Sequence, residues 1–188
     1  LEQPVVPPLR VRELLQVEAA QRPRVAGVAR EHRALHGLGE IDEGENRSVE
    51  VREVKGQDRP LLVEWVEAFA EEAVPDSPAT ASNMVDARLK DGAGGFLLWD
   101  DDGIVSLAGW GGLTPNGVRI GPVYTPPEHR RRGYGSAVTA AASANQLAEG
   151  RRFCFLYTDL ANPTSNKIYM DIGYEPVCDS VDYAFEPA

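Results

Sequence analysis

The sequence predicts an α+β domain built on a mixed, mostly antiparallel sheet. Three consecutive apolar segments separated by turn residues indicate hairpin strands in the middle of the chain. After a basic, glycine-containing loop the pattern changes to strand, helix, strand, and such a crossover normally makes its two strands parallel. With 188 residues, 43% hydrophobic and 26% charged, the chain is long enough for one ordinary domain with residues to spare.

The first 46 residues are set apart by their composition. A short helix is expected over residues 9–20, and an acidic, glycine-containing run over residues 42–46 indicates a linker. We therefore divide the chain into an N-terminal extension, residues 1–46, and a main domain, residues 47–188.

The main domain starts with a strand, two helices and a set of hairpins. Alternating valines predict a strand over residues 49–54, and helical spacing of apolar residues predicts helices near 61–69 and 79–90. The second helix is expected to start near Ser77 or Pro78. The hairpin strands are expected over residues 96–99, 104–110 and 118–124, with Gly103 at the first turn, where a positive φ is required.

The C-terminal part is predicted to alternate helices with strands. A run of small helix formers over residues 133–149 ends at Gly150, and an apolar strand follows over residues 153–157. Asn162 and Pro163 are typical of a helix start, and Gly173 is typical of a helix end. A final strand is expected around residues 181–185.

Charge is distributed unevenly along the chain. The formal net charge is −10, yet residues 119–152 hold six arginines and two acidic residues, a local balance of +4. Residues 59–118 hold three basic and ten acidic residues, a balance of −7. The first stretch therefore suits an anion, and the second would suit a cation.

The loop over residues 123–136 combines the end of a strand, a basic turn and two glycines directly before a helix. A helix N-terminus offers backbone N–H groups and a positive dipole end to an anion. Gly133 and Gly135 let phosphate oxygens approach the backbone. The loop lacks the third glycine of the dinucleotide fingerprint and the Lys-Ser/Thr pair of a P-loop.

Two segments resemble motifs of the GCN5-related N-acetyltransferases (GNAT). The acetyl-CoA loop of that family, Q/R-x-x-G-x-G/A, corresponds to Arg130-x-x-Gly133-x-Gly135. The later pattern N-x-x-A-x-x-x-Y-x-x-x-G-F/Y corresponds to Asn162, Ser165, Tyr169, Gly173 and Tyr174, with Ser165 in place of the common alanine. The resemblance covers residues 47–188 and implies a sheet of about six or seven strands, splayed between two parallel central strands and flanked by helices. Residues 1–46 are similar to the junction in longer relatives with two GNAT-like halves, and would then be the tail of a degenerate first half.

The resemblance also implies which residues bind acetyl-CoA, the acyl donor. Backbone groups at the end of the strand would pair with the pantetheine arm, and the loop and helix start would hold the pyrophosphate. Asn162 would bond the pantetheine, unless it only caps its helix. The expected binding residues are Val123, Tyr124, Thr125, Arg130, Arg131, Arg132, Gly133, Tyr134, Gly135, Ser136, Asn162, Ser165 and Tyr169.

Direct transfer is the mechanism that the resemblance implies. Tyr169 would be the general acid for the departing CoA thiolate, and a base must accept a proton from the attacking amine. The resemblance does not name this base, so Glu72 and Asp159 are the candidates, with Glu71 beside them. Three aromatic residues could line the acceptor site or pack in the core: Trp65, Phe69 and Trp110.

Composition excludes several other classes of function. An acidic chain is a poor nucleic-acid binder, and no apolar run approaches the roughly 20 residues of a membrane span. The two cysteines, Cys154 and Cys178, favour a reducing cytoplasm, and Cys154 in an apolar strand indicates inert core. No metal is expected, because His32, His36 and His129 lack a third ligand at suitable spacing.

The sequence therefore predicts a cytoplasmic, acetyl-CoA-dependent N-acetyltransferase that acts on a primary amine of a small molecule or peptide. The acceptor is expected to be cationic, and a homodimer is one option for the assembly. The alternative is a catalytically degenerate domain of the same fold that serves as a CoA-binding regulatory or interaction module.

Overall fold

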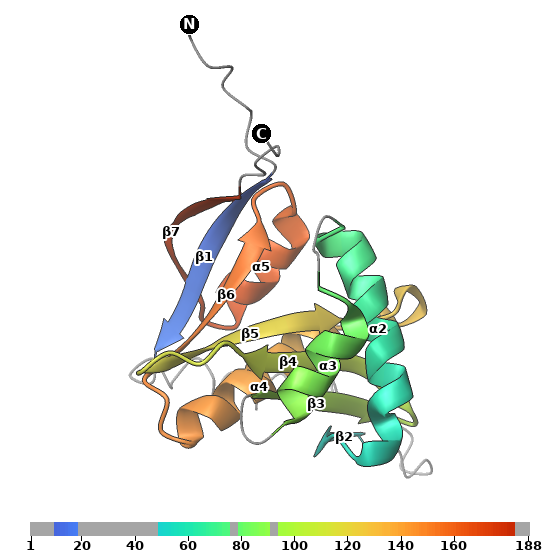
Figure 1. Ribbon diagram of the computed structural model, residues 1–188. Helices are drawn as coiled ribbons and strands as arrows, with labels where there is room; N and C mark the ends of the chain where they lie inside the picture. The colour runs from blue at the N-terminus through green and yellow to red at the C-terminus, as the bar shows by residue number, and fades with distance from the viewer. Residues whose placement is uncertain (1–9, 19–48, 76–78, 91–93, 183–188) are drawn as a thin grey trace, which may run out of the picture.

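One seven-stranded sheet organises the described part of the chain, which comprises residues 10–18, 49–75, 79–90 and 94–182 of the computed structural model (Figure 1). The strand order is β2-β3-β4-β5-β6-β1-β7. The strands are β1 (Arg10–Glu18), β2 (Val49–Glu53), β3 (Gly94–Asp101), β4 (Ile104–Gly111), β5 (Gly117–Tyr124), β6 (Phe153–Asp159) and β7 (Glu175–Asp182). The helices are α2 (Arg59–Ala73), α3 (Ala81–Leu89), α4 (Tyr134–Ala148) and α5 (Pro163–Asp171). The α+β prediction is confirmed.

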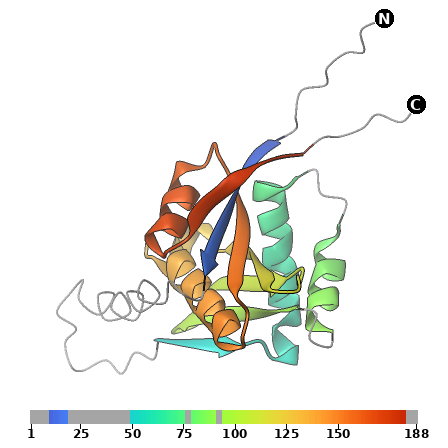
Figure 2. The same cartoon turned by 90° about the vertical axis from the view of Figure 1, so that its left-hand side faces the viewer.

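The sheet lies between two pairs of helices. Figure 2 shows α2 and α3 on one face and α4 and α5 on the other. Alternating residues of the strands supply the two faces, so neighbours in sequence join different cores. On β3, for example, Phe96 and Leu98 pack with α2 and α3, whereas Leu97 and Trp99 pack with α4.

The segment over residues 10–18 is a strand, so the helix expected over residues 9–20 is wrong. β1 is antiparallel to β6 on one side and to β7 on the other. Leu15 and Val17 are buried, whereas Leu14 and Gln16 are partly exposed, which is the two-residue period of a strand. Because β1 pairs with a strand on each side, these tertiary contacts stabilise the strand over the helix that the local pattern favours. The sheet thus includes nine residues of the predicted extension.

The last strand starts earlier than predicted. β7 begins at Glu175, six residues before the expected start at residue 181. Gly173 has φ +105°, and the next residue, Tyr174, is buried in the core, so the chain is already held against the core at residue 174. Pairing with β1 can therefore begin directly after Tyr174. The expected linker over residues 42–46 and the end of the predicted strand, residues 183–185, lie outside the described residues.

The remaining predicted elements are confirmed with small shifts at their ends. Gly103 closes the β3–β4 hairpin with φ +132°, as predicted. α3 begins at Ala81, and its N-cap is Thr80, whose Oγ1 accepts a hydrogen bond from the Asn83 amide at 3.3 Å. The expected start at Ser77 or Pro78 falls on residues outside the described part of the chain.

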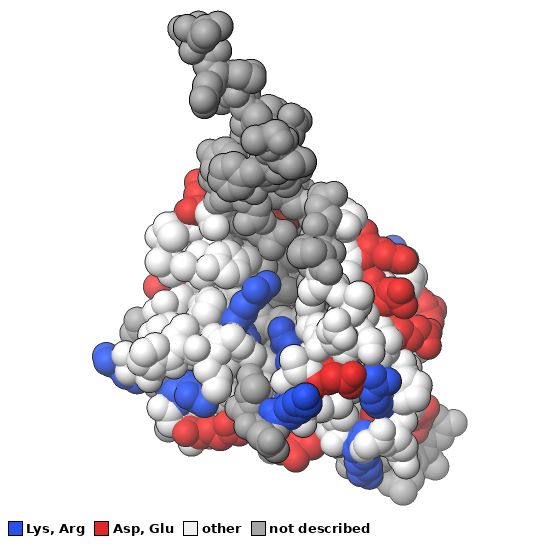
Figure 3. Space-filling view, viewed as in Figure 1, with Lys and Arg blue, Asp and Glu red and all other residues white. Residues whose placement is uncertain are grey.

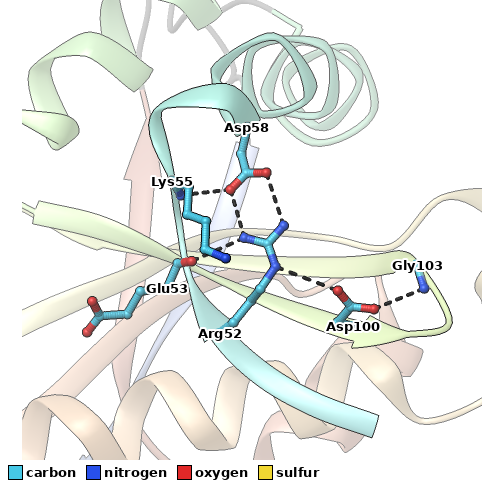
Figure 4. Close-up of polar contacts among 6 residues, drawn as sticks. All are labelled: Arg52, Glu53, Lys55, Asp58, Asp100 and Gly103. Carbon is cyan, nitrogen blue, oxygen red and sulfur yellow. Dashed lines mark hydrogen bonds and ion pairs between the residues drawn. The ribbon is translucent and has the colours of Figure 1, made fainter. Parts of the chain in front are cut away.

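A bidentate ion pair anchors β2 and the start of α2. The Arg52 guanidinium donates to both Asp58 carboxylate oxygens at 2.8 and 3.0 Å, and the Lys55 amide donates to Asp58 Oδ2 at 2.7 Å (Figure 4). The hydrogen bond from Arg52 is the main cause that lowers the pKa of the nearly buried Asp58. Arg52 also lies 3.6 Å from Asp100, whose other oxygen accepts from the Gly103 amide. The pair thereby ties α2 to the β3–β4 hairpin.

The two central strands separate soon after they meet. β5 and β6 are parallel neighbours, as predicted, but they pair only where Gly117–Arg119 lies beside Phe153–Phe155. Beyond Arg119 the two strands diverge, so within the described ranges no strand pairs with the β6-facing edge of β5. This divergence opens the sheet next to the loop that precedes α4.

No helix within the described ranges combines the length and the apolar character that crossing a bilayer would require.

Replacing Leu15 with alanine tests the place of β1 in the sheet. Because Leu15 is fully buried between β6 and β7, its loss should lower the free energy of unfolding by about 2–5 kcal/mol. The matched variant Leu14→Ala removes the same atoms from the partly exposed face and should cost about 1 kcal/mol or less. Urea denaturation measures both, and equal losses would contradict the alternation of a strand.

Candidate functional site

A cavity of about 550 Å³ lies where β5 and β6 diverge. Figure 3 shows a hollow between the β6 side and the α2 side of the molecule. The predicted site residues that line the cavity come from α2, β5, the loop, α4, β6 and α5. They are Glu72, Val123, Tyr124, Thr125, Arg130, Arg131, Gly133, Tyr134, Gly135, Ser136, Asp159, Asn162, Ser165 and Tyr169. Arg132 is exposed and does not line it.

A buried hydroxyl on the neighbouring strand fixes the end of β5. Ser106 on β4 donates to the Tyr124 carbonyl at 3.0 Å, and its oxygen lies 2.8 Å from Thr125 Oγ1. Since the single Ser106 proton is used on Tyr124, Thr125 donates to Ser106. The divergent end of β5 therefore keeps its direction without a partner strand on the β6 side.

Arg130 fastens the basic loop to two other elements. Its Nε donates to the Thr125 carbonyl at 2.9 Å, and its Nη2 donates to both Glu72 carboxylate oxygens at 2.8 and 2.9 Å. The guanidinium carbon also lies 5.8 Å from the Tyr124 ring centroid. Arg130 thus holds the loop against β5 and the C-terminal end of α2, although the sequence indicated an arginine aimed at phosphate.

The loop ends in a left-handed turn that starts α4. Arg131 and Gly133 have φ +64° and +81°, and Gly133 is the N-cap of α4. The amides of the first helical turn have no carbonyl partners within a helix, so their N–H groups and the dipole favour an anion. The buried Tyr134 hydroxyl donates to Asp101, which ties this turn to β3.

Space above the helix start is open. A Cβ built on Gly135 would have one neighbour within 4 Å, Thr125 Oγ1 at 3.4 Å. Packing within the described residues therefore does not require glycine at this position. The glycine at position 135 is explained if a ligand approaches the backbone closely there.

A buried nitrogen beside the cavity lacks a partner. His129 lines the cavity, and its Nδ1 has no hydrogen-bond partner among the described residues. An unsatisfied buried polar atom is rare and calls for a ligand or a water molecule. Together with the α4 amides and Arg131, it makes this end of the cavity suited to phosphate oxygens. These residues fit the pyrophosphate of acetyl-CoA.

The opposite wall is formed by the end of β6 and the start of α5. The Asn162 side chain accepts from the Ser165 amide at 3.1 Å, so it does cap the helix while also lining the cavity. Asn166 accepts from the Thr158 hydroxyl at 2.7 Å and donates to the Asp159 carbonyl at 3.3 Å. These bonds fix α5 to β6. The two elements lie across the cavity from the loop over residues 123–136, which we call the glycine loop.

Tyr169 lies on α5, lines the cavity and packs beside Tyr174, with ring centroids 6.1 Å apart. Burial raises the pKa of Tyr169 to about 12. Within the described part of the chain its hydroxyl makes no hydrogen bond, whereas the Tyr174 hydroxyl pairs with Ser143 Oγ at 2.7 Å. The Tyr169 hydroxyl is therefore protonated and available to a ligand.

The candidate bases differ in their surroundings. Both Glu72 oxygens are taken by Arg130. Asp159 uses Oδ1 to accept from the Ala161 amide at 2.8 Å, and Oδ2 has no hydrogen bond among the described residues. Glu71 is exposed and does not line the cavity.

The three aromatic candidates separate into wall and core. Phe69 lines the cavity, whereas Trp65 is buried in the core with α3 and β3, and Trp110 packs against the core on the α4 face. Helical spacing alone could not distinguish Trp65 from Phe69, since both lie on the apolar side of α2.

Sequence reasoning missed residues that only the divergence of the strands brings to the cavity. Arg119 on β5 and Tyr157 on β6 line it, with the Arg119 guanidinium carbon 5.3 Å from the Tyr157 ring centroid. Arg119 was counted in the basic stretch without a role. Of the acidic residues in the stretch over residues 59–118, Glu72 alone among those described lines the cavity.

Cys154 is core, as predicted. It is buried on β6, and burial raises the pKa of its thiol to about 12. Within the described ranges, no three side chains of the types His, Cys, Asp and Glu are grouped for a metal ion. His32 and His36 lie outside those ranges.

Residues 98–181 match the family model of the FR47-like proteins. The fold is shared with a GCN5-related N-acetyltransferase from Kribbella flavida (22% identity, TM-score 0.57) and one from Sphaerobacter thermophilus (18%, 0.60). The alignments cover 93% of this chain in both cases but 58% and 51% of those proteins, so this chain spans little more than half of their length. No curated protein matches the sequence significantly.

A further structure with this fold was solved with a ligand. AAC(6')-Iy, in complex with the bisubstrate analogue CoA-S-monomethyl-acetylneamine, aligns with 74% of this chain and 99% of its own, at 16% identity and a TM-score of 0.58. The match to the FR47-like model over residues 98–181 and the shared fold together support a GNAT-type domain in this chain.

Proposed function

We propose that this chain transfers an acetyl group from acetyl-CoA to the primary amine of a small molecule or peptide by direct attack. The observation that carries the proposal is the cavity between β5 and β6, which brings the glycine loop, the open edge of β5 and Tyr169 to one place. The binding of a CoA conjugate by AAC(6')-Iy supports the donor.

The donor would lie along the divergent strands. The α4 amides and His129 would bind the pyrophosphate, and the open backbone edge of β5 near Val123 would pair with the amide groups of the pantetheine arm. Ser106 and Arg130 would act as positioning residues, because they hold the end of β5 and the loop in place.

The chemistry needs one proton donor and one proton acceptor. The free amine nitrogen bonds to the thioester carbon, the carbon–sulfur bond breaks, and the sulfur leaves with the bonding electron pair. Tyr169 would donate its proton to this thiolate, and a carboxylate would accept the proton that the amine loses. Asp159 is the better placed of the two candidates, because Arg130 occupies both oxygens of Glu72.

Gly135→Ala tests the donor site without disturbing the fold. The added Cβ has room within the protein but would occupy the space proposed for pyrophosphate, so CoA affinity should fall tenfold or more. The free energy of unfolding should stay the same or rise by up to about 1 kcal/mol. Calorimetric titration with CoA and urea denaturation measure the two effects.

Gly133→Ala is the matched control for that variant. Its left-handed φ of +81° makes any side chain strained, so this variant should lose about 1–2 kcal/mol of stability. A Gly135→Ala protein that binds CoA as tightly as the parent would contradict the proposed donor site.

Tyr169→Phe tests the general acid. Removing the hydroxyl should lower kcat about a hundredfold or more while changing the KM for acetyl-CoA little. Since burial raises the pKa of Tyr169 to about 12, this residue should impose no fall in rate between pH 7 and 10. CoA thiol release with a panel of amines measures both.

The control for Tyr169→Phe is Tyr174→Phe, which removes a buried hydroxyl outside the cavity lining. It should cost about 1 kcal/mol of stability and leave kcat within about threefold. An unchanged kcat in Tyr169→Phe would remove the assigned role. No turnover with any amine, despite CoA binding, would favour the degenerate CoA-binding module.

Thiol labelling tests direct transfer against an acyl-enzyme. The buried Cys154 thiol, with its pKa raised to about 12, should react with iodoacetamide at pH 8 far more slowly than the exposed Cys178. Mass spectrometry identifies the labelled peptide. Rapid labelling of Cys154, or an acetylated Cys154 peptide after incubation with acetyl-CoA, would contradict direct attack.

A further inference from the structure

A β-bulge interrupts β5 close to the point where this strand leaves β6. The last residue of β5 that pairs with β6 is Arg119. On the β4 side, the next part of β5 is out of register, because Gly121 and Pro122 together lie opposite the single residue Gly109. A bulge bends its strand and increases the local twist. The bulge therefore lies where β5 turns away from β6 and the cavity opens.

The guanidinium of Arg88, on α3, contacts this bulge. Its Nη1 donates a hydrogen bond to the Gly121 carbonyl, and its guanidinium carbon lies 5.6 Å from the Phe96 ring centroid. Gly109 leaves the space that the guanidinium occupies, because a Cβ at this position would lie 2.8 Å from Arg88 Nη1 and 3.0 Å from the Phe96 ring. Residues of β3, β4 and β5 thus surround this one side chain.

Arg88 brings its charge to the bulge without a carboxylate partner. Among the described residues it takes part in no ion pair. Burial first, and then the charge of Arg119, lower the pKa of Arg88 to about 10, so the side chain is still protonated at neutral pH. Partial burial of a cation that has no carboxylate costs free energy. The hydrogen bond to the bulge is what a guanidinium supplies here and an apolar side chain would not.

We propose that Arg88 is a positioning residue for acetyl-CoA, because its hydrogen bond fixes the bulge and thereby the course of the β6-facing edge of β5. The inference rests on the proposed function, in which that edge near Val123 pairs with the pantetheine arm. Arg88 does not line the cavity, so it would act only through β5. The pyrophosphate would bind at the start of α4, which Arg130 and Tyr134 hold through other contacts.

Two ligands separate the pantetheine arm from the pyrophosphate. CoA contains both, whereas 3′-phosphoadenosine 5′-diphosphate is CoA without the pantetheine arm. Arg88→Met should weaken the binding of CoA about tenfold and leave the binding of the truncated nucleotide within about twofold, because only the contacts of the arm depend on the bulge. Calorimetric titration with each ligand measures the two affinities.

Two further variants test the same contact without deleting the charge. Arg88→Lys should recover part of the loss, because an ammonium can donate to the Gly121 carbonyl but lacks the planar guanidinium. Gly109→Ala keeps Arg88 but removes its space, so it should also weaken CoA selectively. The matched control is Arg59→Met, which removes an exposed arginine that contacts α3 through Asp86 at 2.8 Å and should change neither affinity.

The outcomes separate the two proposals. Equal loss of both ligands in variants that circular dichroism shows to be folded, or loss of neither, overturns the role of Arg88 and leaves the acetyltransferase proposal intact. Binding of neither ligand by the parent protein overturns both proposals. If Arg88→Met does not fold, Arg88→Lys and Gly109→Ala decide by the same comparison.

Discussion

The early separation of β5 and β6 is the constraint on which the site depends. Three paired residues hold the strands together, and beyond Arg119 the edge of β5 pairs with no strand in the part of the chain that the structure describes. Backbone groups at an open edge need partners, and an extended ligand with amide groups can supply them. The same separation lets side chains of both strands line one cavity, so the proposed donor site and the proposed catalytic residues share a single opening in the sheet.

Polar contacts hold that opening in shape where strand pairing cannot. Ser106 anchors the end of β5 from the adjacent strand, and Arg130 joins β5, the loop and α2. Asn166 holds α5 against β6 on the other side. Each contact joins elements that lie far apart in sequence, so the rim of the cavity is fixed by tertiary bonds around a gap in the sheet.

The distribution of charged residues along the sequence differs from the set of charged side chains that line the cavity. In the acidic stretch of the sequence, Glu64, Glu67 and Glu71 lie exposed on α2, where water screens their charges. Arg119 and Arg131 line the cavity instead, because β5 and the loop before α4 form part of its wall. A local count of charged residues therefore predicts a basic loop beside the cavity, but it does not predict which charged side chains line the rest of it.

Local sequence determined the hairpins, the helix caps and the glycine loop, because each depends on a few adjacent residues. Gly103 and Gly133 adopt the left-handed conformations that their turns need, and Asn162 caps α5 as its position predicts. The two motifs also lie in segments that line the cavity, where they supply Gly133, Gly135, Asn162 and Tyr169.

Only the tertiary structure decided the rest. Residues 10–18 form a strand because β6 and β7 pair with both of their edges. Arg130 turns to Glu72, which lies 58 residues away, and Arg119 meets Tyr157 across the divergence. The physical reason is the same in each case: these preferences come from partners that are distant in sequence, and no short pattern encodes a partner that folding alone brings near.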